Sequence, residues 1–161
     1  MATISETDVL GALNEIEDPE MPAISIVELG IVRDVKIDGG AAEVTLAPTF
    51  SGCPALAMIT ESVRKKILEI GFVEVNVKLC FDPPWSTDCI SEPGRQKLKQ
   101  MGIAPPEMHG GDVLTALELP AECPYCGSRN TARRNSFGTT PCRAIHFCNN
   151  CIQPFERVKP L

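Results

Sequence analysis

Two Cys-x-x-Cys pairs constrain the fold of this chain more than any other feature. Cys123 and Cys126 form the first pair, Cys148 and Cys151 form the second, and twenty-one residues separate the pairs. Four thiolates at this spacing can surround one metal ion as a tetrahedron, with Zn–S bonds of about 2.3 Å. Three short strands are expected here, at 131–137, 143–147 and 153–158. We therefore predict a zinc ribbon over residues 120–161, which would take much of its folding energy from the metal because it is too small for its own core.

The same four cysteines could instead hold iron, as in a rubredoxin-like centre. The protein fills all four ligand positions and no redox-partner motif accompanies them, so one structural zinc per chain is the stronger prediction. Cys142 is a fifth thiol in this segment, outside both pairs. It is either buried packing or a spare sulfur. His109 and His146 lack partners at metal-ligand spacing, and we interpret both as structural or exposed.

Charge is distributed unevenly along the chain. Residues 121–161 carry six Lys and Arg and two Glu, a net charge of +4, whereas residues 1–120 carry nine Lys and Arg and nineteen Asp and Glu, a net charge of −10. Four thiolates and one Zn²⁺ together contribute −2, which leaves the ribbon at about +2. Nucleic-acid binding by this ribbon is therefore an alternative that the charge disfavours.

The first thirty residues contain seven acidic residues and no Lys or Arg, which argues against a secretory or transit peptide. No apolar run of about 18 residues is present, so no membrane span is expected. We expect a cytoplasmic protein. Because cytosolic thiols stay reduced, the eight cysteines are expected to bind metal or to act as reactive sulfur rather than to form disulfides.

The rest of the chain predicts a compact α+β domain over residues 1–102, with elements in the order α-β-β-α-β-α. Helices are expected at 7–16, 54–70 and 92–101, and strands at 31–37, 42–47 and 73–81. Thr7 would cap the first helix and Ser91 the last. Residues 103–119 are rich in Pro and Gly, and we interpret them as a linker in which the segment VLTALEL could form a short strand.

Apolar periodicity supports these elements. One stripe at helical spacing runs along the second helix: Leu56, Ile59, Val63, Ile67 and Ile70. The last strand alternates, with five apolar residues on its inward face: Val73, Val75, Val77, Leu79 and Phe81. Asp38-Gly39-Gly40 is a hairpin turn between the first two strands.

Cys53 is a candidate reactive thiol at the start of the strongest helix. Its predicted place is the N-cap, with Pro54 as the first helical residue. Main-chain N–H groups and the helix dipole would favour the thiolate there and lower the pKa of Cys53. A small residue that simply fits the cap is the alternative.

Cys80 and Cys89 could converge with Cys53, and with Asp18 or Glu20, on a labile iron or iron–sulfur site. Separate thiols are the favoured interpretation, because the sequence does not bring them together. Asp18 and Glu20 are equally consistent with carboxylates in a turn after a helix. The chain has no glycine-rich phosphate loop, dinucleotide fingerprint, Glu-x-x-His pair or serine elbow, so catalysis by this chain alone is not expected.

Motifs throughout the chain carry a resemblance to two families. Three motifs in the first domain resemble the SufT-like family of iron–sulfur cluster assembly: Asp18-Pro19-Glu20-x-Pro22, Ser25-Ile-Val-Glu-Leu-Gly-Ile-Val32 and Pro48-Thr49-x-x-Gly52-Cys53-Pro54. The later motifs look like the D-type (also called J-type) subunit family of bacterial phenylacetyl-CoA epoxidase: Pro84-Trp85-x-Thr87-Asp88-x-Ile90-Ser91-x-x-Gly94-Arg95, Gly102-Ile-Ala-Pro-Pro106, Ser136-Phe-Gly-x-Thr140-x-Cys142 and Cys151-x-x-Pro154-Phe155.

The resemblance implies an accessory role in aerobic phenylacetate degradation. In that system a di-iron subunit epoxidises the ring and a flavin/iron–sulfur reductase works with it. The D-type subunit is expected to help mature a metal centre, such as an iron–sulfur cluster of the reductase, and to hold at most a transient iron or cluster. A stable structural subunit of the oxygenase complex is the alternative.

By the same resemblance, Cys53, Asp18 and Glu20 are the functional thiol and turn of the first domain, and Cys142 matches an additional cysteine of the ribbon. Cys89 departs from the family, which usually has an aromatic residue at that position. This departure weakens the hypothesis of a three-cysteine site.

Overall fold

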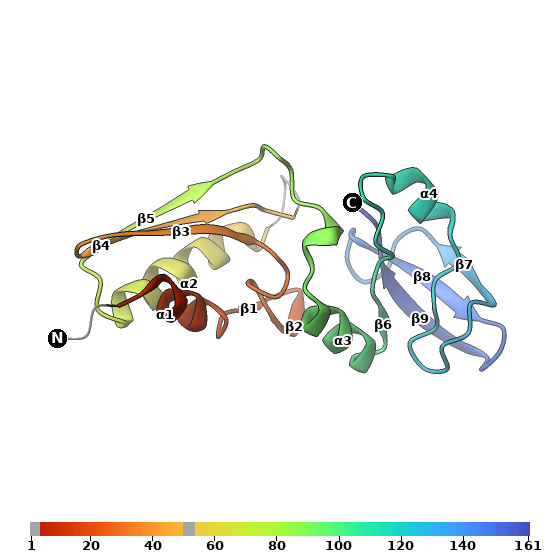
Figure 1. Ribbon diagram of the computed structural model, residues 1–161. Coiled ribbons are helices and arrows are strands. Elements are labelled where there is room, and N and C mark those ends of the chain that lie inside the picture. The colour runs from red at the N-terminus through yellow and green to blue at the C-terminus, as the bar shows by residue number, and fades with distance from the viewer. Residues whose placement is uncertain (1–3, 50–53) are drawn as a thin grey trace. The chain divides into compact units, whose positions relative to one another are not determined.

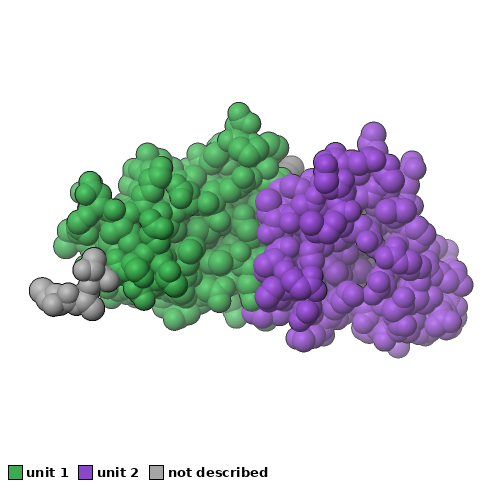
Figure 2. Space-filling view, viewed as in Figure 1, with its two compact units in different colours: residues 1–85 green, residues 86–161 purple. Residues whose placement is uncertain are grey.

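The computed structural model describes residues 4–49 and 54–161 (Figure 1). The chain divides into two compact units, residues 1–85 and residues 86–161 (Figure 2). Both units combine helices with strands, so the predicted α+β class is confirmed. Within the described part of the chain, no helix is long and apolar enough to cross a membrane.

The first unit is a small three-stranded sheet with two helices on one side (Figure 1). Its elements are α1 (Glu6–Leu13), β1 (Glu17–Asp18), β2 (Met21–Ser25), β3 (Val32–Asp38), β4 (Ala41–Leu46), α2 (Leu56–Glu69) and β5 (Glu74–Leu79). β3 and β4 form the predicted antiparallel hairpin, and β5 pairs with β4 in parallel after the α2 crossover. β1 and β2 form a separate two-stranded sheet that the sequence did not predict.

The apolar stripe of α2 forms the centre of this core, as predicted. Ile59, Val63 and Ile67 are buried, and the two ends of the stripe are half-buried. The predicted inward face of β5 is confirmed at Val75, which is buried, but is wrong at Val73, Leu79 and Phe81, which are 84%, 43% and 54% exposed. β5 is an edge strand that covers only Glu74–Leu79, so Val73 and Phe81 lie beyond the sheet and Leu79 lies at its end.

Two helix caps differ from the sequence-based prediction. Ser5, rather than Thr7, caps α1 through a capping box, in which the Asp8 main-chain N–H donates to Ser5 Oγ at 3.2 Å and the Ser5 N–H donates to Asp8 Oδ2 at 2.8 Å. Ala55 occupies the N-cap position of α2, so the placement of Cys53 at that cap is wrong. Cys53 itself lies outside the described residues.

The second unit is built on a four-stranded sheet in the order β6-β9-β8-β7. Its elements are the 3₁₀ helix η1 (Thr87–Cys89), α3 (Glu92–Gln100), β6 (Ile103–Ala104), α4 (Val113–Glu118), β7 (Thr131–Asn135), β8 (Arg143–Cys148) and β9 (Gln153–Val158). β7, β8 and β9 are antiparallel neighbours and confirm the three predicted ribbon strands. Ser91 caps α3 as predicted, since the Gly94 N–H donates to its hydroxyl at 3.3 Å.

The structure differs most from the sequence-based prediction at residues 103–119. The prediction placed a linker there, after a first domain that ended at residue 102. β6 pairs in parallel with β9, and the segment VLTALEL contains the helix α4 instead of a strand. Asp112 caps this helix, because its carboxylate accepts the Thr115 N–H at 3.2 Å. α3, β6 and α4 therefore belong to the same compact unit as the ribbon strands.

Candidate metal centre

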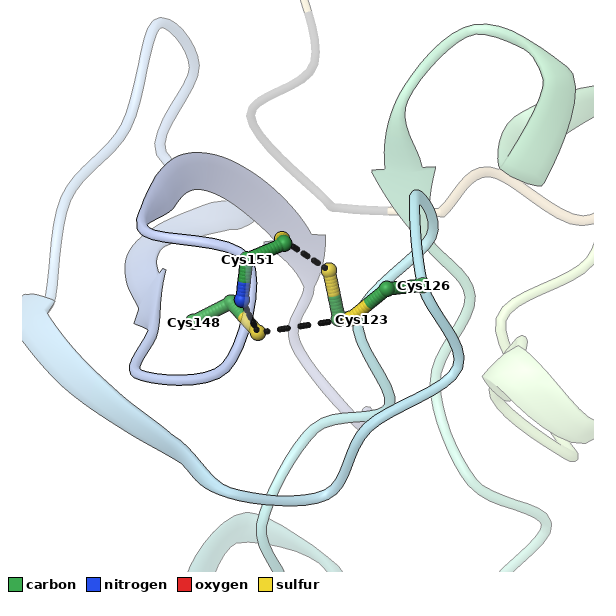
Figure 3. Close-up of side chains that lie close together, drawn as sticks. All are labelled: Cys123, Cys126, Cys148 and Cys151. Carbon is green, nitrogen blue, oxygen red and sulfur yellow. Dashed lines mark hydrogen bonds between the residues drawn. The ribbon is translucent and has the colours of Figure 1, made fainter.

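The four cysteines of the two Cys-x-x-Cys pairs come together beside the end of β8 (Figure 3). Their sulfur atoms all lie within 4.8 Å of one another. Cys123 Sγ lies 3.6 Å from Cys151 Sγ, and Cys126 Sγ lies 3.6 Å from Cys148 Sγ. Thiolates arranged as a tetrahedron around zinc, with Zn–S bonds of about 2.3 Å, have S–S edges of about 3.8 Å. A disulfide bond would be about 2.05 Å. The spacing and the donor chemistry therefore fit one tetrahedral metal ion and no disulfide.

The first pair lies in a tight turn that requires a residue with left-handed backbone geometry. Gly127 follows the pair with a φ of 73°, and its N–H donates to the Cys123 main-chain oxygen at 2.9 Å. The Cys123 N–H in turn donates to the Ser128 main-chain oxygen at 2.9 Å. Glycine adopts this φ without the Cβ clash of other residues, so the sequence places it where the turn requires it.

The second pair repeats this geometry with a bulkier residue. Ile152 follows it with a φ of 59°. The Cys151 N–H points at Cys148 Sγ at 3.5 Å, and the Asn150 amide donates to Cys126 Sγ at 3.6 Å. Such N–H···S contacts favour thiolate sulfur, because they place positive partial charge against it.

Burial and hydrogen bonding separate the acidities of these thiols. The hydrogen bond from the Ser128 main chain, with the Asn150 amide, lowers the pKa of Cys126 to about 6. Burial raises the pKa of Cys123, and burial with the neighbouring thiols raises the pKa of Cys151 to about 12. A metal ion that binds here must displace protons from the thiols that remain protonated.

The remaining cysteines do not join this cluster. Among residues 4–49 and 54–161, the four cysteines are the single group of three or more His, Cys, Asp or Glu side chains close enough to hold a metal. Cys142 is half-buried, with its sulfur 3.1 Å from Thr140 Oγ1. Cys80 Sγ donates to the Asp82 main-chain oxygen at 3.1 Å, and Cys89 is exposed in η1. The favoured interpretation of separate thiols and the alternative of convergence on Cys53 both involve a residue outside the described range, so neither is tested.

Asp18 forms the turn between β1 and β2. Its side chain is buried, and Oδ1 accepts the main-chain N–H groups of Glu20 at 2.8 Å and Met21 at 3.0 Å. Asp18 and Glu20 therefore lie in one tight turn. The Asp18 carboxylate organises the main chain of this turn, and the Glu20 side chain is half-exposed. This geometry agrees with the interpretation of Asp18 as a turn carboxylate.

Both histidine side chains are buried, and neither joins the cysteine cluster. The His109 side chain is buried, with Nδ1 accepting the Gly111 N–H at 3.0 Å and Nε2 lying 3.2 Å from the Leu161 main-chain oxygen. His146 is buried and stacks on Phe155 with 5.6 Å between the ring centroids. Burial, with the nearby positive charges of Arg157 and Arg133, lowers the pKa of His146 to about 4.

Comparisons with known proteins match an assembly-type domain in the first compact unit and a ribbon in the second. The family described as iron–sulfur cluster assembly protein matches residues 6–79, and the PaaD zinc beta ribbon domain matches residues 109–159. A solved structure of a domain of unknown function from Bacillus anthracis superposes with a TM-score of 0.54 and 32% identity, covering 58% of this chain and 90% of that one. A conserved hypothetical protein from Thermotoga maritima gives a TM-score of 0.53 and 35% identity, covering 61% of this chain and 98% of that one.

The fold and the cysteine cluster thus define a class of protein in which an iron–sulfur assembly domain precedes a four-cysteine ribbon. An Fe-S protein maturation auxiliary factor of Bacillus subtilis is 35% identical over 86 residues, which cover 52% of this chain and 83% of that protein. A protein of Escherichia coli K12, described as the D-type subunit of a 1,2-phenylacetyl-CoA epoxidase, is 36% identical over 94% of this chain and 91% of its own length. The chain belongs to this family of D-type epoxidase subunits, and the resemblance inferred from its motifs is confirmed.

Proposed function

We propose that this chain is an accessory maturation subunit of a bacterial phenylacetyl-CoA 1,2-epoxidase system, and that it assists assembly of an iron–sulfur cluster or other metal centre in a partner such as the reductase. Sequence similarity to two described proteins carries the proposal. The chain is related over 94% of its length to a protein described as the D-type epoxidase subunit, and its first domain is related to a protein named as an Fe-S maturation factor. In this proposal the chain acts on its partners and does not itself epoxidise the substrate.

The ribbon in this proposal holds one structural zinc ion through Cys123, Cys126, Cys148 and Cys151. Four protein thiolates would fill the tetrahedron and leave no position for a substrate, which is typical of a structural site. The ion would supply folding energy to a segment whose apolar cluster consists of a few residues around the cysteines themselves. The ligand set and the spacing of the sulfurs support a tetrahedral metal site, and the zinc ribbon family that matches this segment supports zinc over iron.

Cys53 is the proposed functional thiol, and Asp18 and Glu20 form the proposed functional turn of the first domain. Thiolate sulfur is a good ligand for iron and for iron–sulfur clusters. Iron or a cluster held there would be cargo for the partner rather than a resident cofactor. Because the Asp18 carboxylate already binds two main-chain N–H groups, we propose that it shapes the turn that presents Glu20.

The test is the metal content of the reductase purified from phenylacetate-grown cells with and without this protein. Maturation predicts a reductase depleted of iron and labile sulfide in the deletion strain, restored by a plasmid copy of the chain. The other epoxidase components serve as a control, because a selective loss in one partner identifies the client. Full cluster occupancy of every component in the deletion strain would contradict the proposal.

A stable structural subunit of the oxygenase complex is the second candidate, favoured because the Escherichia coli relative is described as an epoxidase subunit. Co-purification with the oxygenase at a fixed stoichiometry would support it. The two roles also differ in vitro. Mature oxygenase and reductase should epoxidise phenylacetyl-CoA without this chain if it is a maturation factor, whereas dependence of turnover on the added chain would favour the structural role.

Nucleic-acid binding by the ribbon is a weaker third candidate. Two of its arginines already form ion pairs, Arg129 with Glu107 at 3.1 Å and Arg143 with Glu156 at 3.0 Å. These contacts reduce the positive charge available for phosphates. Salt-sensitive binding to DNA would support this candidate over the other two.

A further inference from the structure

One face of the ribbon sheet gathers two arginines and a histidine from three adjacent strands. Arg133 on β7 pairs with His146 on β8, and Ala144 on β8 pairs with Arg157 on β9. Directly opposed residues in antiparallel strands project to the same face, as do residues two apart in one strand. Arg133, His146 and Arg157 therefore share a face.

α4 lies against this same face. The Arg157 guanidinium donates to the main-chain oxygens of Ala116 and Leu119, both at 2.9 Å. Between α4 and the sheet is a cavity of about 150 Å³, and Leu117, Arg133, Ser136, His146, Arg157 and Lys159 are among the residues that line it. No acidic side chain of the described residues lines this cavity. A second hollow beside it shares Leu117, Arg133 and His146.

Two buried groups in this cavity have unmet hydrogen-bonding capacity. Arg157 is 3% exposed, its Nε has no hydrogen-bond partner, and no carboxylate in the described ranges lies within ion-pair distance of it. His146 is 5% exposed, and its Nδ1 has no hydrogen-bond partner. Buried charges are normally paired and buried polar atoms normally hydrogen-bonded, because each otherwise loses its interaction with water.

Arg133 adds a further guanidinium group at the exposed side of the cavity. It forms no ion pair and no side-chain hydrogen bond with any described residue, although it lines both hollows. Lys159 brings a further positive charge, with its ammonium group 4.6 Å from the centre of the Phe137 ring. A ligand that complements this site must carry negative charge and accept several hydrogen bonds.

We propose that the cavity between α4 and the ribbon sheet binds a compact oxyanion, a phosphate or carboxylate group, through Arg133 and Arg157. His146 Nδ1 and the hydroxyl of Ser136 are further groups that can bind its oxygens, and Lys159 contributes charge. The size of the cavity limits the bound part to a group of a few heavy atoms, whether a free anion or one end of a larger molecule. The planar guanidinium groups suit both phosphate and carboxylate, which accept paired N–H donors.

The test uses the full-length, zinc-loaded protein, titrated in separate experiments with inorganic phosphate and with sodium acetate. Sodium chloride at matched ionic strength is the reference, and binding is followed by calorimetry and by NMR of the ¹⁵N-labelled protein. The proposal predicts saturable binding of at least one anion, with shifts concentrated at Arg133, His146 and Arg157. Binding of phosphate alone identifies a phosphoryl ligand, and binding of acetate alone identifies a carboxylate.

Two neighbouring arginines provide a matched pair of variants. Arg133→Gln should weaken binding about tenfold, or about 1.4 kcal/mol. Arg134→Gln removes the same charge from the next residue of β7, whose guanidinium lies 5.3 Å from the centre of the Phe147 ring, and should change affinity less than twofold. Arg133 is exposed, so its replacement should leave the melting temperature unchanged. Lys159→Gln is a second variant if Arg133→Gln proves unstable.

Either of two results would overturn the proposal. The first is that phosphate and acetate both bind no better than chloride. The second is that Arg133→Gln and Arg134→Gln weaken binding equally, which would indicate a general response to net charge rather than a site.

Discussion

Gly127 and Ile152 occupy equivalent places in the two metal-binding turns, each directly after the second cysteine of its pair, with φ angles of 73° and 59°. Both turns therefore require left-handed backbone, which costs a residue with a Cβ about 1–2 kcal/mol. Gly127 avoids this cost. Ile152 does not, and its side chain is 66% exposed, so packing does little to offset the strain.

Ile152→Gly should therefore stabilise the zinc-loaded protein by about 1 kcal/mol, since relief of the strain outweighs the entropy that glycine loses on folding. Denaturant unfolding monitored in the second unit measures this change. Gly127→Ala is the converse variant: nothing lies within 4 Å of an added Cβ, so only the backbone conformation opposes it, and it should destabilise by about 1 kcal/mol. A loss of stability in Ile152→Gly would show that the isoleucine side chain has a packing role.

Removal of one metal ligand should unfold the ribbon and leave the first unit folded. The protein purified under reducing conditions should contain about one zinc per chain. In Cys126→Ser, zinc content should fall, and the amide signals of β7, β8 and β9 should collapse. The signals of β3, β4 and β5 should persist, because that unit has its own core of buried apolar residues on α2 and the sheet. Stoichiometric iron in place of zinc would contradict the assignment of the metal.

The capping box of α1 should be visible in the acid titration of Asp8. Hydrogen bonds from the side chain and main chain of Ser5 hold the pKa of Asp8 below its ordinary value of 3.8. A carboxyl group with a depressed folded pKa adds stability above its unfolded pKa, and this contribution is lost as pH falls through the folded pKa. The cap should therefore weaken in acid, below about pH 4.

Ser5→Ala should return the pKa of Asp8 toward 3.8 and destabilise α1 by about 1 kcal/mol, as is usual for the loss of an N-cap. Carboxyl NMR shifts across the acid range give the pKa directly. Thr7→Ala is the control, because Thr7 was the sequence-based choice of cap and takes no part in the capping box. An unchanged Asp8 pKa in Ser5→Ala would contradict the capping geometry.

The sequence predicted the elements that depend on local pattern. The Gly39-Gly40 turn between alternating strands, the stripe on α2 and the strands that follow each cysteine pair were all confirmed, because each is encoded within one short stretch of sequence. The same holds for the cysteine cluster, whose spacing reflects a turn that each pair forms on its own.

Elements that depend on distant partners were not predicted. α4 lies in a segment interpreted as a linker with a possible short strand. Its cap, Asp112, and the arginine that binds its C-terminal end, Arg157, lie outside the apolar pattern. β6 covers two residues and exists only through its pairing with β9. The cationic cavity has the same origin: Arg133, His146 and Arg157 are far apart in sequence, and strand register alone brings them to one face.

The central claim is that this chain matures a metal centre of its partner through Cys53. The most direct measurement is the iron and labile sulfide content of the reductase purified from deletion cells that carry wild-type protein, Cys53→Ser or Cys80→Ser. Because Ala55 holds the N-cap of α2, the Cys53 change removes no helix cap, and its melting temperature should match that of the wild type. We predict a cluster-depleted reductase with Cys53→Ser and a fully loaded one with Cys80→Ser. A fully loaded reductase with Cys53→Ser would contradict the account.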